Sequence, residues 1–475
     1  MKAARRPFLL GAGAFLAGAA LPETGRSGPL ARPLMPTGRT VEHWLVAAER
    51  MVRIPADAGP EVPAWTFGPE PLPMIRLQRG DSLRVRAENR LDQLISIHWH
   101  GIRVPNAMDG VPYLTQDPIR TGGSFDYTFT PPDTGTFFFH THCNTIEQLG
   151  RGLAGVLIVE GDELVRHDAD LVCVLRDWRI DGQGGFAEFT SNAAAAKAGT
   201  FGQVRTVNDR VEPVLEVPAG GEVRLRILNI DPTRIALLGL EGTPAAVIAI
   251  DGNGLPPVPL ESWRLGPAMR IDLSVRAPGP GEEAVLYDYF SAEPVPLARL
   301  RGMGPRLDRG RFDPAPLIPS DFPAPDLEKA ETFRLTFQST AVASDLVLPD
   351  GQVLRYADSI CLSSATLWAI DRKTWPEAGH QQLPPPLFEL VKGRSYVIEL
   401  VNLSQYQHPI HLHGVTFQVL DPRQGESGQR ADTVLLGPRD RVRIAFVADN
   451  PGDWMLHCHI IEHQETGMMG WFRIA

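Results

Sequence analysis

Short runs in which apolar and polar residues alternate recur along the chain between turns rich in glycine and proline, as is typical of half-buried β-strands. Three of these stretches share one plan. A strand reaches a glycine, a tight turn follows, and a second strand ends at an asparagine nine residues after that glycine. The copies run from Pro73 to Asn89, from Pro213 to Asn229 and from Pro386 to Asn402. The pattern therefore predicts one β-rich unit that occurs three times.

A second repeat lies downstream of the first in each copy. The strand Phe125–Phe129 leads to His140, and the strand Val442–Phe446 leads to His457 over the same interval. The corresponding strand of the middle copy, Ile271–Val275, is followed by no histidine. The outer two copies thus carry histidines that the middle copy lacks.

Together the repeats predict an all-β protein of three consecutive Greek-key β-sandwich domains. The length of 475 residues agrees with several domains, and 45 glycines and 43 prolines favour many turns. We place the domains at residues 40–162, 163–305 and 325–475. The proline-rich segment 305–325 is interpreted as the linker between the second and the third.

The N-terminal segment departs from this pattern. Arg5 and Arg6 precede an apolar, glycine-rich run from Phe8 to Leu21 that is too short for a good membrane span. The paired arginines indicate that residues 1–22 are a twin-arginine-type signal peptide, with a general secretory signal as the alternative. We therefore expect a periplasmic or secreted protein with no membrane insertion after signal removal.

The net charge limits the classes of partner, and the cysteines limit the disulfides that can form. The formal net charge of −10 argues against nucleic acid or an anionic membrane surface as a partner. An exported protein permits a disulfide, but the sequence does not choose a pair among Cys143, Cys173 and Cys361 if the fourth cysteine, Cys458, binds a metal.

Ten of the thirteen histidines lie in or next to four short motifs in which histidines alternate. The motifs are His98-Trp99-His100, His140-Thr141-His142, His408-Pro409-Ile410-His411-Leu412-His413 and His457-Cys458-His459, the last followed by His463 and Met468. Successive side chains on a strand point to opposite faces, so Cys458 serves one metal site while His457 and His459 point to another. Two histidines, one cysteine and a weak axial methionine are the ligands of a blue, or type 1, copper.

In these four motifs the chain resembles the multicopper oxidases of the three-domain, laccase-like bacterial group, over roughly Trp65 to the C-terminus. The resemblance implies cupredoxin-like domains, four copper ions per chain, and a trinuclear cluster between the outer domains, with the middle domain as a structural spacer. It implies that the type 1 copper is bound by His408, Cys458, His463 and Met468. It implies that the type 2 copper is bound by His98 and His411, and the type 3 pair by His100, His140, His142, His413, His457 and His459. Met469 is a rival axial ligand, with core packing as its alternative role.

Oxygen reduction also needs protons. By resemblance, Asp109 is a catalytic carboxylate near the trinuclear cluster, although an Asp-Gly turn is a simpler explanation of the Asp109-Gly110 pair. Many bacterial members of the family carry a second carboxylate directly after the type 1 histidine, where this chain has Gln464. Glu462 or Glu465 is the candidate substitute, and Glu462 is taken as catalytic together with Asp109 and Cys458.

The resemblance implies an enzyme that oxidises phenolic or aromatic donors one electron at a time and reduces O2 to water. The alternatives are a periplasmic metallo-oxidase that converts Cu(I) to Cu(II), and a structural relative without turnover. Cu(I) oxidases often carry a methionine-rich segment, whereas the ten methionines here are scattered. We expect a monomer whose partners are O2 and a small-molecule or metal-ion donor, with a substrate lid at Arg423–Arg430.

Overall fold

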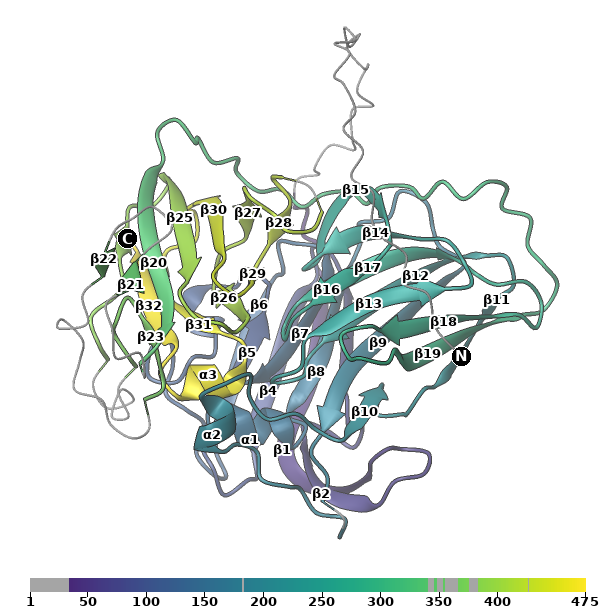
Figure 1. Ribbon diagram of the computed structural model, residues 1–475, viewed down its shortest axis with the longest axis horizontal. Helices are drawn as coiled ribbons and strands as arrows, with labels where there is room; N and C mark the ends of the chain where they lie inside the picture. Colours follow the sequence, from purple (N-terminus) through teal and green to yellow (C-terminus); the bar gives the residue numbers. More distant parts are fainter. Residues whose placement is uncertain are drawn as a thin grey trace, which may run out of the picture.

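The computed structural model describes residues 34–181, 183–340, 346–347, 353–354, 366–375, 383–425 and 427–475. Six of its sheets hold four to six strands and form three β-sandwiches that follow one another along the chain (Figure 1). The predicted all-β fold of three consecutive cupredoxin-like domains is confirmed. The proposed signal peptide at residues 1–22 and Cys361 lie outside the described residues. Within these residues, no helix has the length and apolar character needed to cross a membrane.

The first sandwich packs the sheet β2-β1-β4-β6 against the sheet β3-β8-β7-β5. Leu45 and Leu83 from one sheet and Ile75 and Phe137 from the other are buried in one apolar core. Its elements are β1 (Thr40–Arg53), β2 (Glu61–Thr66), β3 (Met74–Gln78), β4 (Ser82–Asn89), β5 (Ile97–His100), the 3-10 helix η1 (Asn106–Met108), β6 (Ser124–Phe129), β7 (Gly135–Thr141), α1 (Thr145–Gly150) and β8 (Ala154–Glu160).

The middle sandwich has a six-stranded sheet in the order β10-β9-β12-β17-β14-β15 and a five-stranded sheet in the order β11-β19-β18-β13-β16. Its elements are β9 (Ala169–Trp178), α2 (Asn192–Ala195), β10 (Val204–Val207), β11 (Val214–Pro218), β12 (Glu222–Asn229), β13 (Ala236–Glu241), β14 (Ala245–Ile250), β15 (Asn253–Pro259), β16 (Trp263–Leu265), β17 (Arg270–Arg276), β18 (Glu283–Asp288) and β19 (Val295–Met303).

The third sandwich has sheets in the orders β23-β20-β25-β30-β27-β28 and β24-β32-β31-β26-β29, beside the small hairpin β21-β22. Its elements are β20 (Glu331–Ser339), β21 (Leu346–Val347), β22 (Val353–Leu354), β23 (Trp368–Ile370), β24 (Glu389–Leu390), β25 (Ser395–Asn402), β26 (His408–Leu412), β27 (Phe417–Val419), β28 (Arg430–Ala431), β29 (Thr433–Leu436), β30 (Arg441–Val447), β31 (Gly452–Cys458), α3 (Ile461–Glu465) and β32 (Met469–Ile474).

The strand–turn–strand repeat has the same place in every sandwich. Strands β3, β11 and β24 lie in one sheet, and the strands that follow them, β4, β12 and β25, lie in the other. The repeat is therefore the corner at which the chain passes from one sheet to the other. The turn glycine is Gly80, Gly220 or Gly393, and each has a positive φ, a conformation that glycine adopts without strain.

The asparagine that closes each repeat is explained by its hydrogen bonds. The buried amide of Asn89 donates to the carbonyl oxygens of Gln93 at 2.6 Å and Ile119 at 2.9 Å. Asn229 and Asn402 make equivalent pairs of bonds in the other two sandwiches. Each asparagine thus connects the end of its strand to two later segments of the same sandwich.

Candidate metal centre

The alternating histidines lie on two pairs of antiparallel strands, one in each outer sandwich. In the first sandwich β5 pairs with β7, which sets His98 opposite His140. In the third sandwich β26 pairs with β31, which sets His411 opposite His457 and Ile410 opposite Cys458. The two strand pairs approach each other at the centre of the molecule (Figure 1).

Imidazole rings of the two outer sandwiches stack directly on each other. The ring centroids of His98 and His413 are 3.8 Å apart, and those of His100 and His411 are 3.7 Å apart. All of these side chains are buried. The predicted interface between the first and third domains is therefore formed by the histidines themselves.

The hydrogen bonds of the rings define which nitrogen of each ring keeps its lone pair. A carbonyl oxygen accepts from the Nδ1–H of His98, His140 and His411 at 2.8 to 2.9 Å. The Nε2 atoms of these rings are buried, and none has a hydrogen-bond partner among the described residues. Burial lowers the pKa of His140 and His411, so the rings are neutral near pH 7 and offer a free lone pair.

Two ring nitrogens, one of His413 and one of His457, lie at a distance that suits a shared cation. His413 donates through Nδ1 to Asp109 Oδ2 at 3.0 Å, and His457 donates through Nδ1 to the Cys458 carbonyl at 3.0 Å. Both Nε2 atoms therefore carry lone pairs, yet they lie 3.1 Å apart. Two lone pairs at this distance repel each other unless a proton or a metal ion is shared between them.

The donor atoms gather into groups that suit copper, for which imidazole is a preferred ligand. In each group the donor atoms lie within 4.8 Å of one another and all residues are buried. The three histidine groups are His98, His100 and His411; His100, His140 and His459; and His142, His413 and His457.

A fourth group contains the thiol. Cys458 Sγ lies 3.6 Å from His408 Nδ1 and 3.7 Å from His463 Nδ1. His463 donates through Nε2 to the Lys197 carbonyl at 2.8 Å, so its Nδ1 keeps the lone pair, only 3.0 Å from His408 Nδ1. Burial raises the pKa of Cys458 and lowers the pKa of His463 to about 3. One sulfur and two imidazole nitrogens thus face a common point, and the set fits a type 1 copper.

Met468 lies on the same side of its sheet as Cys458. The Cys458 N–H donates to the Met468 carbonyl at 3.1 Å, and the neighbouring pair in the register is His457 opposite Met469. Directly opposed residues of antiparallel strands point to the same face, so Met468 faces the core with Cys458. Met469 points the other way and packs against a cluster that includes Trp471.

This arrangement gives a prediction for Met468, the expected axial ligand. A thioether donates weakly to copper and stabilises the oxidised ion more than an apolar side chain does. We expect Met468→Leu to raise the reduction potential of the type 1 copper by tens of millivolts. Redox titration of the blue absorbance measures this reduction potential. Met469→Leu is the matched control, and a rise in Met469→Leu without one in Met468→Leu would exchange the two assignments.

Asp109 contacts histidines of both outer sandwiches. Its carboxylate lies 3.0 Å from His413 Nδ1 and 3.2 Å from His98 Nδ1, and the residue is 1% exposed. The turn at Asp109 also needs its glycine, because a Cβ on Gly110 would lie 1.8 Å from the Ile97 carbonyl oxygen. The turn therefore serves to place the carboxylate beside the histidine groups.

The other candidate carboxylates have different partners. Glu462 accepts hydrogen bonds from the Thr190 hydroxyl at 2.9 Å and the Thr200 hydroxyl at 2.7 Å, and Arg179 lies 3.7 Å away. Glu465 accepts from the N–H of Thr145 at 3.0 Å. No hydrogen bond between described residues joins either glutamate to a histidine. Glu462 thus holds residues 190–200 of the middle sandwich, and the Lys197 carbonyl of this segment contacts His463.

The sequence does not identify residues 190–200, the covering segment, as part of the site. The Lys197 carbonyl accepts from His463, and the Ala195 carbonyl at the end of α2 accepts from the Trp368 indole at 2.7 Å. The Trp368 ring lies against the His463 ring, with centroids 4.4 Å apart. Because both contacts use backbone carbonyls, the side chains of this segment carried no signal that would have identified it.

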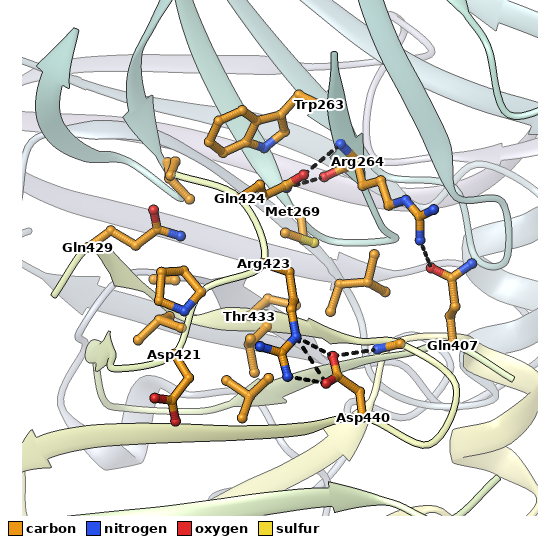
Figure 2. A pocket seen from close by; sticks show the side chains of 18 of the residues that line it. Trp263, Arg264, Met269, Gln407, Asp421, Arg423, Gln424, Gln429, Thr433 and Asp440 are labelled. Carbon is orange, nitrogen blue, oxygen red and sulfur yellow. Dashed lines mark hydrogen bonds and ion pairs between the residues drawn. The ribbon is translucent and has the colours of Figure 1, made fainter. Parts of the chain in front are cut away.

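A cavity of about 290 Å³ lies between the middle and third sandwiches (Figure 2). Trp263 and Met269 line it from the middle sandwich, and Val434 and Leu435 line it from β29. The Trp263 indole N–H is buried and has no hydrogen-bond partner within the described part of the chain. Gln407, which also lines the cavity, directly precedes His408.

The loop after β27 closes one side of this cavity. Gln424 makes two hydrogen bonds to the Arg264 backbone, at 2.7 and 2.9 Å, and Arg423 pairs with Asp440 (Figure 2). The segment Arg423–Arg430, which the sequence singled out, therefore includes cavity-lining residues.

Comparisons with known proteins agree with this centre. Two family models described as multicopper oxidase match residues 50–164 and 362–475. The chain is 40% identical to a multi-copper oxidase from Pseudomonas thermotolerans, with a TM-score of 0.80 over 92% of this chain and 99% of that one. It is 39% identical to one from Pseudomonas parafulva, with a TM-score of 0.79 over 91% and 100%. It is 28% identical to the multicopper oxidase MmcO of Mycobacterium tuberculosis, over 91% of this chain and 86% of MmcO.

Proposed function

The chain belongs to the multicopper oxidase family, and we propose that it couples one-electron oxidation of phenolic or aromatic donors to the four-electron reduction of O2 to water. As a member of the family it is an oxidoreductase that uses O2. We further propose that the protein is exported and acts as a monomer. A type 1 copper would accept electrons from the donor, and a trinuclear copper cluster would supply the site of O2 reduction.

In this proposal four copper ions supply the redox chemistry, and the protein supplies their ligands. The type 1 ligands are His408, Cys458, His463 and Met468. The type 2 ligands are His98 and His411. The type 3 ligands are His100, His140 and His459 for one ion and His142, His413 and His457 for the other. These sets follow the groups into which the donor atoms gather.

The observation that carries the proposal is the position of Cys458 between two histidines of different groups. Cys458 faces His408 and His463, whereas His457 and His459 face separate histidine groups on the other side of the strand. Two peptide units therefore connect the thiol covalently to both groups. A protein that merely stored copper would not need this connection, but an enzyme that passes electrons from one donor site to O2 does.

Asp109 is the proposed proton carrier. Its Oδ2 atom accepts from His413 Nδ1 and its Oδ1 atom lies near His98 Nδ1, so it orients both rings. As a buried carboxylate beside these rings, it would hold and release protons that O2 reduction consumes. Glu462, by contrast, is a positioning residue that holds Thr190 and Thr200 of the covering segment.

The cavity that Gln407 helps to line favours an organic donor. Its walls are largely apolar, and the Trp263 N–H offers a hydrogen bond to a phenolic oxygen. The carboxylates at its rim are paired with arginine, Asp421 with Arg443 and Asp440 with Arg423, and are poorly suited to bind a metal-ion substrate. All groups of metal-binding side chains among the described residues belong to the centre itself.

The test compares oxygen consumption with a methoxyphenol and with Cu(I). We expect a higher kcat/KM for the phenol, and Trp263→Phe should raise KM for the phenol about 3- to 10-fold, because one hydrogen bond contributes roughly 1 kcal/mol. Trp375→Phe is the control, since the Trp375 N–H is also buried without a described partner but does not line the cavity. Faster turnover of Cu(I), with no effect of Trp263→Phe, would contradict the phenolic assignment.

A further inference from the structure

We propose that Arg270 of the middle sandwich is a positioning residue of the trinuclear site. With Asp251 it holds Asp432, and Asp432 in turn fixes the imidazole rings of His100 and His411. The inference rests on the proposed copper centre and goes beyond it, because it gives the middle domain a part in oxygen reduction rather than the role of a spacer.

Asp432, the residue before β29, contacts one histidine from each outer sandwich. Its carbonyl oxygen accepts from His411 Nδ1 at 2.9 Å. Its Oδ1 atom lies 3.2 Å from His100 Nε2 and accepts from the Thr433 hydroxyl at 2.8 Å. These contacts leave His100 Nδ1 and His411 Nε2 buried and without partners among the described residues, and so available to a metal ion. Asp432 therefore determines which nitrogen of each ring faces the centre.

Arg270, the first residue of β17, holds the Asp432 carboxylate with two parallel hydrogen bonds. Nη1 donates to Oδ1 at 2.9 Å and Nη2 donates to Oδ2 at 2.7 Å, which fixes the carboxylate plane as well as its position. The Arg270 Nε–H also donates to the carbonyl of Thr136 on β7 at 3.2 Å. One fully buried guanidinium thus contacts all three sandwiches beside the histidines.

Asp251, which follows β14, supports the same arrangement from the other side. Its Oδ1 atom accepts from the Arg270 N–H at 2.9 Å. Its Oδ2 atom accepts from the backbone N–H groups of Asp432 at 3.3 Å and Thr433 at 3.2 Å. Both the backbone and the carboxylate of Asp432 are therefore held by the middle sandwich.

The ion pair also packs directly on the first histidine motif. A Cβ on Gly101 would lie 2.3 Å from Arg270 Nη2 and 2.4 Å from Asp432 Oδ2. The residue after His100 is therefore a glycine whose missing side chain leaves room for the guanidinium and the carboxylate. A pair that merely joined domains at the surface would not need this close approach to the motif.

The chain offers a closely matched control in Arg224 on β12. Its side chain is as fully buried as that of Arg270, and it pairs with Asp162 at 2.7 Å and Asp272 at 2.6 Å. None of its hydrogen bonds to described residues reaches a histidine of the centre. Substituting Arg224 therefore breaks a buried ion pair of the same domain without touching the histidines.

The experiment compares Arg270→Gln, Arg270→Lys and Arg224→Gln in the full-length, copper-loaded protein. The readouts are copper content, the electron paramagnetic resonance of the type 2 copper, the type 1 absorbance and thermal unfolding. We expect Arg270→Gln to change the type 2 hyperfine splitting and to weaken binding of that copper about 10- to 100-fold, as loss of a ligand's supporting hydrogen bonds does. Arg270→Lys should restore part of the affinity. Arg224→Gln should lower the unfolding temperature and leave the type 2 spectrum as in the parent protein.

The outcomes separate this inference from the proposed function. A parent protein without a type 2 signal contradicts the proposed centre itself. A normal parent signal that is unchanged in Arg270→Gln, or changed equally in Arg224→Gln, overturns the role of Arg270. If Arg270→Gln does not fold, Asp432→Asn tests the same contact, since it keeps the side-chain volume and removes the charge. An altered type 2 spectrum with normal type 1 absorbance then supports the inference, and an unaltered one overturns it.

Discussion

Replacing Cys458 by serine abolishes the blue absorbance of the copper-loaded protein and lowers donor oxidation by about three orders of magnitude or more, a change of about 4 kcal/mol or more in the barrier. The thiol is the soft ligand of its group, and a serine hydroxyl binds copper poorly in its place. It also begins the covalent connection to His457 and His459. The optical spectrum and steady-state oxygen consumption measure the two effects.

The matched control for this substitution is Cys173→Ser. Cys173 is likewise a buried free thiol whose pKa burial raises to about 12, but it lies in the core of the middle sandwich. We expect Cys173→Ser to keep the blue absorbance and turnover. The three histidine groups should still bind copper in Cys458→Ser. A blue Cys458→Ser variant would show that the type 1 site lies elsewhere.

Replacing Asp109 by asparagine should slow the reaction with O2 about 100-fold or more, the usual contribution of a positioned acid or base. Asparagine has nearly the same shape, so the turn at Gly110 is retained, but it does not exchange protons as a carboxylate does. Donor oxidation at the type 1 copper should proceed as before. Stopped-flow measurement separates donor oxidation from the reaction with O2. We expect anaerobic bleaching of the blue band to keep its rate and reoxidation by O2 to become slow.

Glu462→Gln is the control for that experiment, because the sequence made both carboxylates candidates. Glu462 is bonded to Thr190 and Thr200, so its substitution should leave reoxidation by O2 nearly unchanged. The reverse result, with slow reoxidation in Glu462→Gln and normal reoxidation in Asp109→Asn, would transfer the proton role to Glu462.

Much of the fold could be predicted because its causes are local. Strand alternation and the repeated glycine and asparagine are read directly from the sequence, and each repeat became a corner between two sheets. The separation of Cys458 from His457 and His459 follows from the period of two in a strand, and the structure places them accordingly.

The unpredicted parts of the centre depend on contacts between distant residues or on the backbone. Arg270 and Asp432 are 162 positions apart, and nothing near either residue in the sequence distinguishes their ion pair from those on the surface. The contact of the Lys197 carbonyl with His463 involves no side chain of Lys197. Glu462 is a candidate from the sequence as a substitute for the carboxylate that Gln464 replaces, and its place on α3 directs it to Thr190 and Thr200.

The central claim is that one chain holds a thiolate copper site joined to a separate histidine-bound copper cluster. It is tested most directly by an optical spectrum of the copper-loaded protein with copper quantified in the same sample. The account predicts an intense blue thiolate-to-copper band together with about four copper ions per chain. A colourless protein, or a blue one that binds a single copper ion, would contradict it.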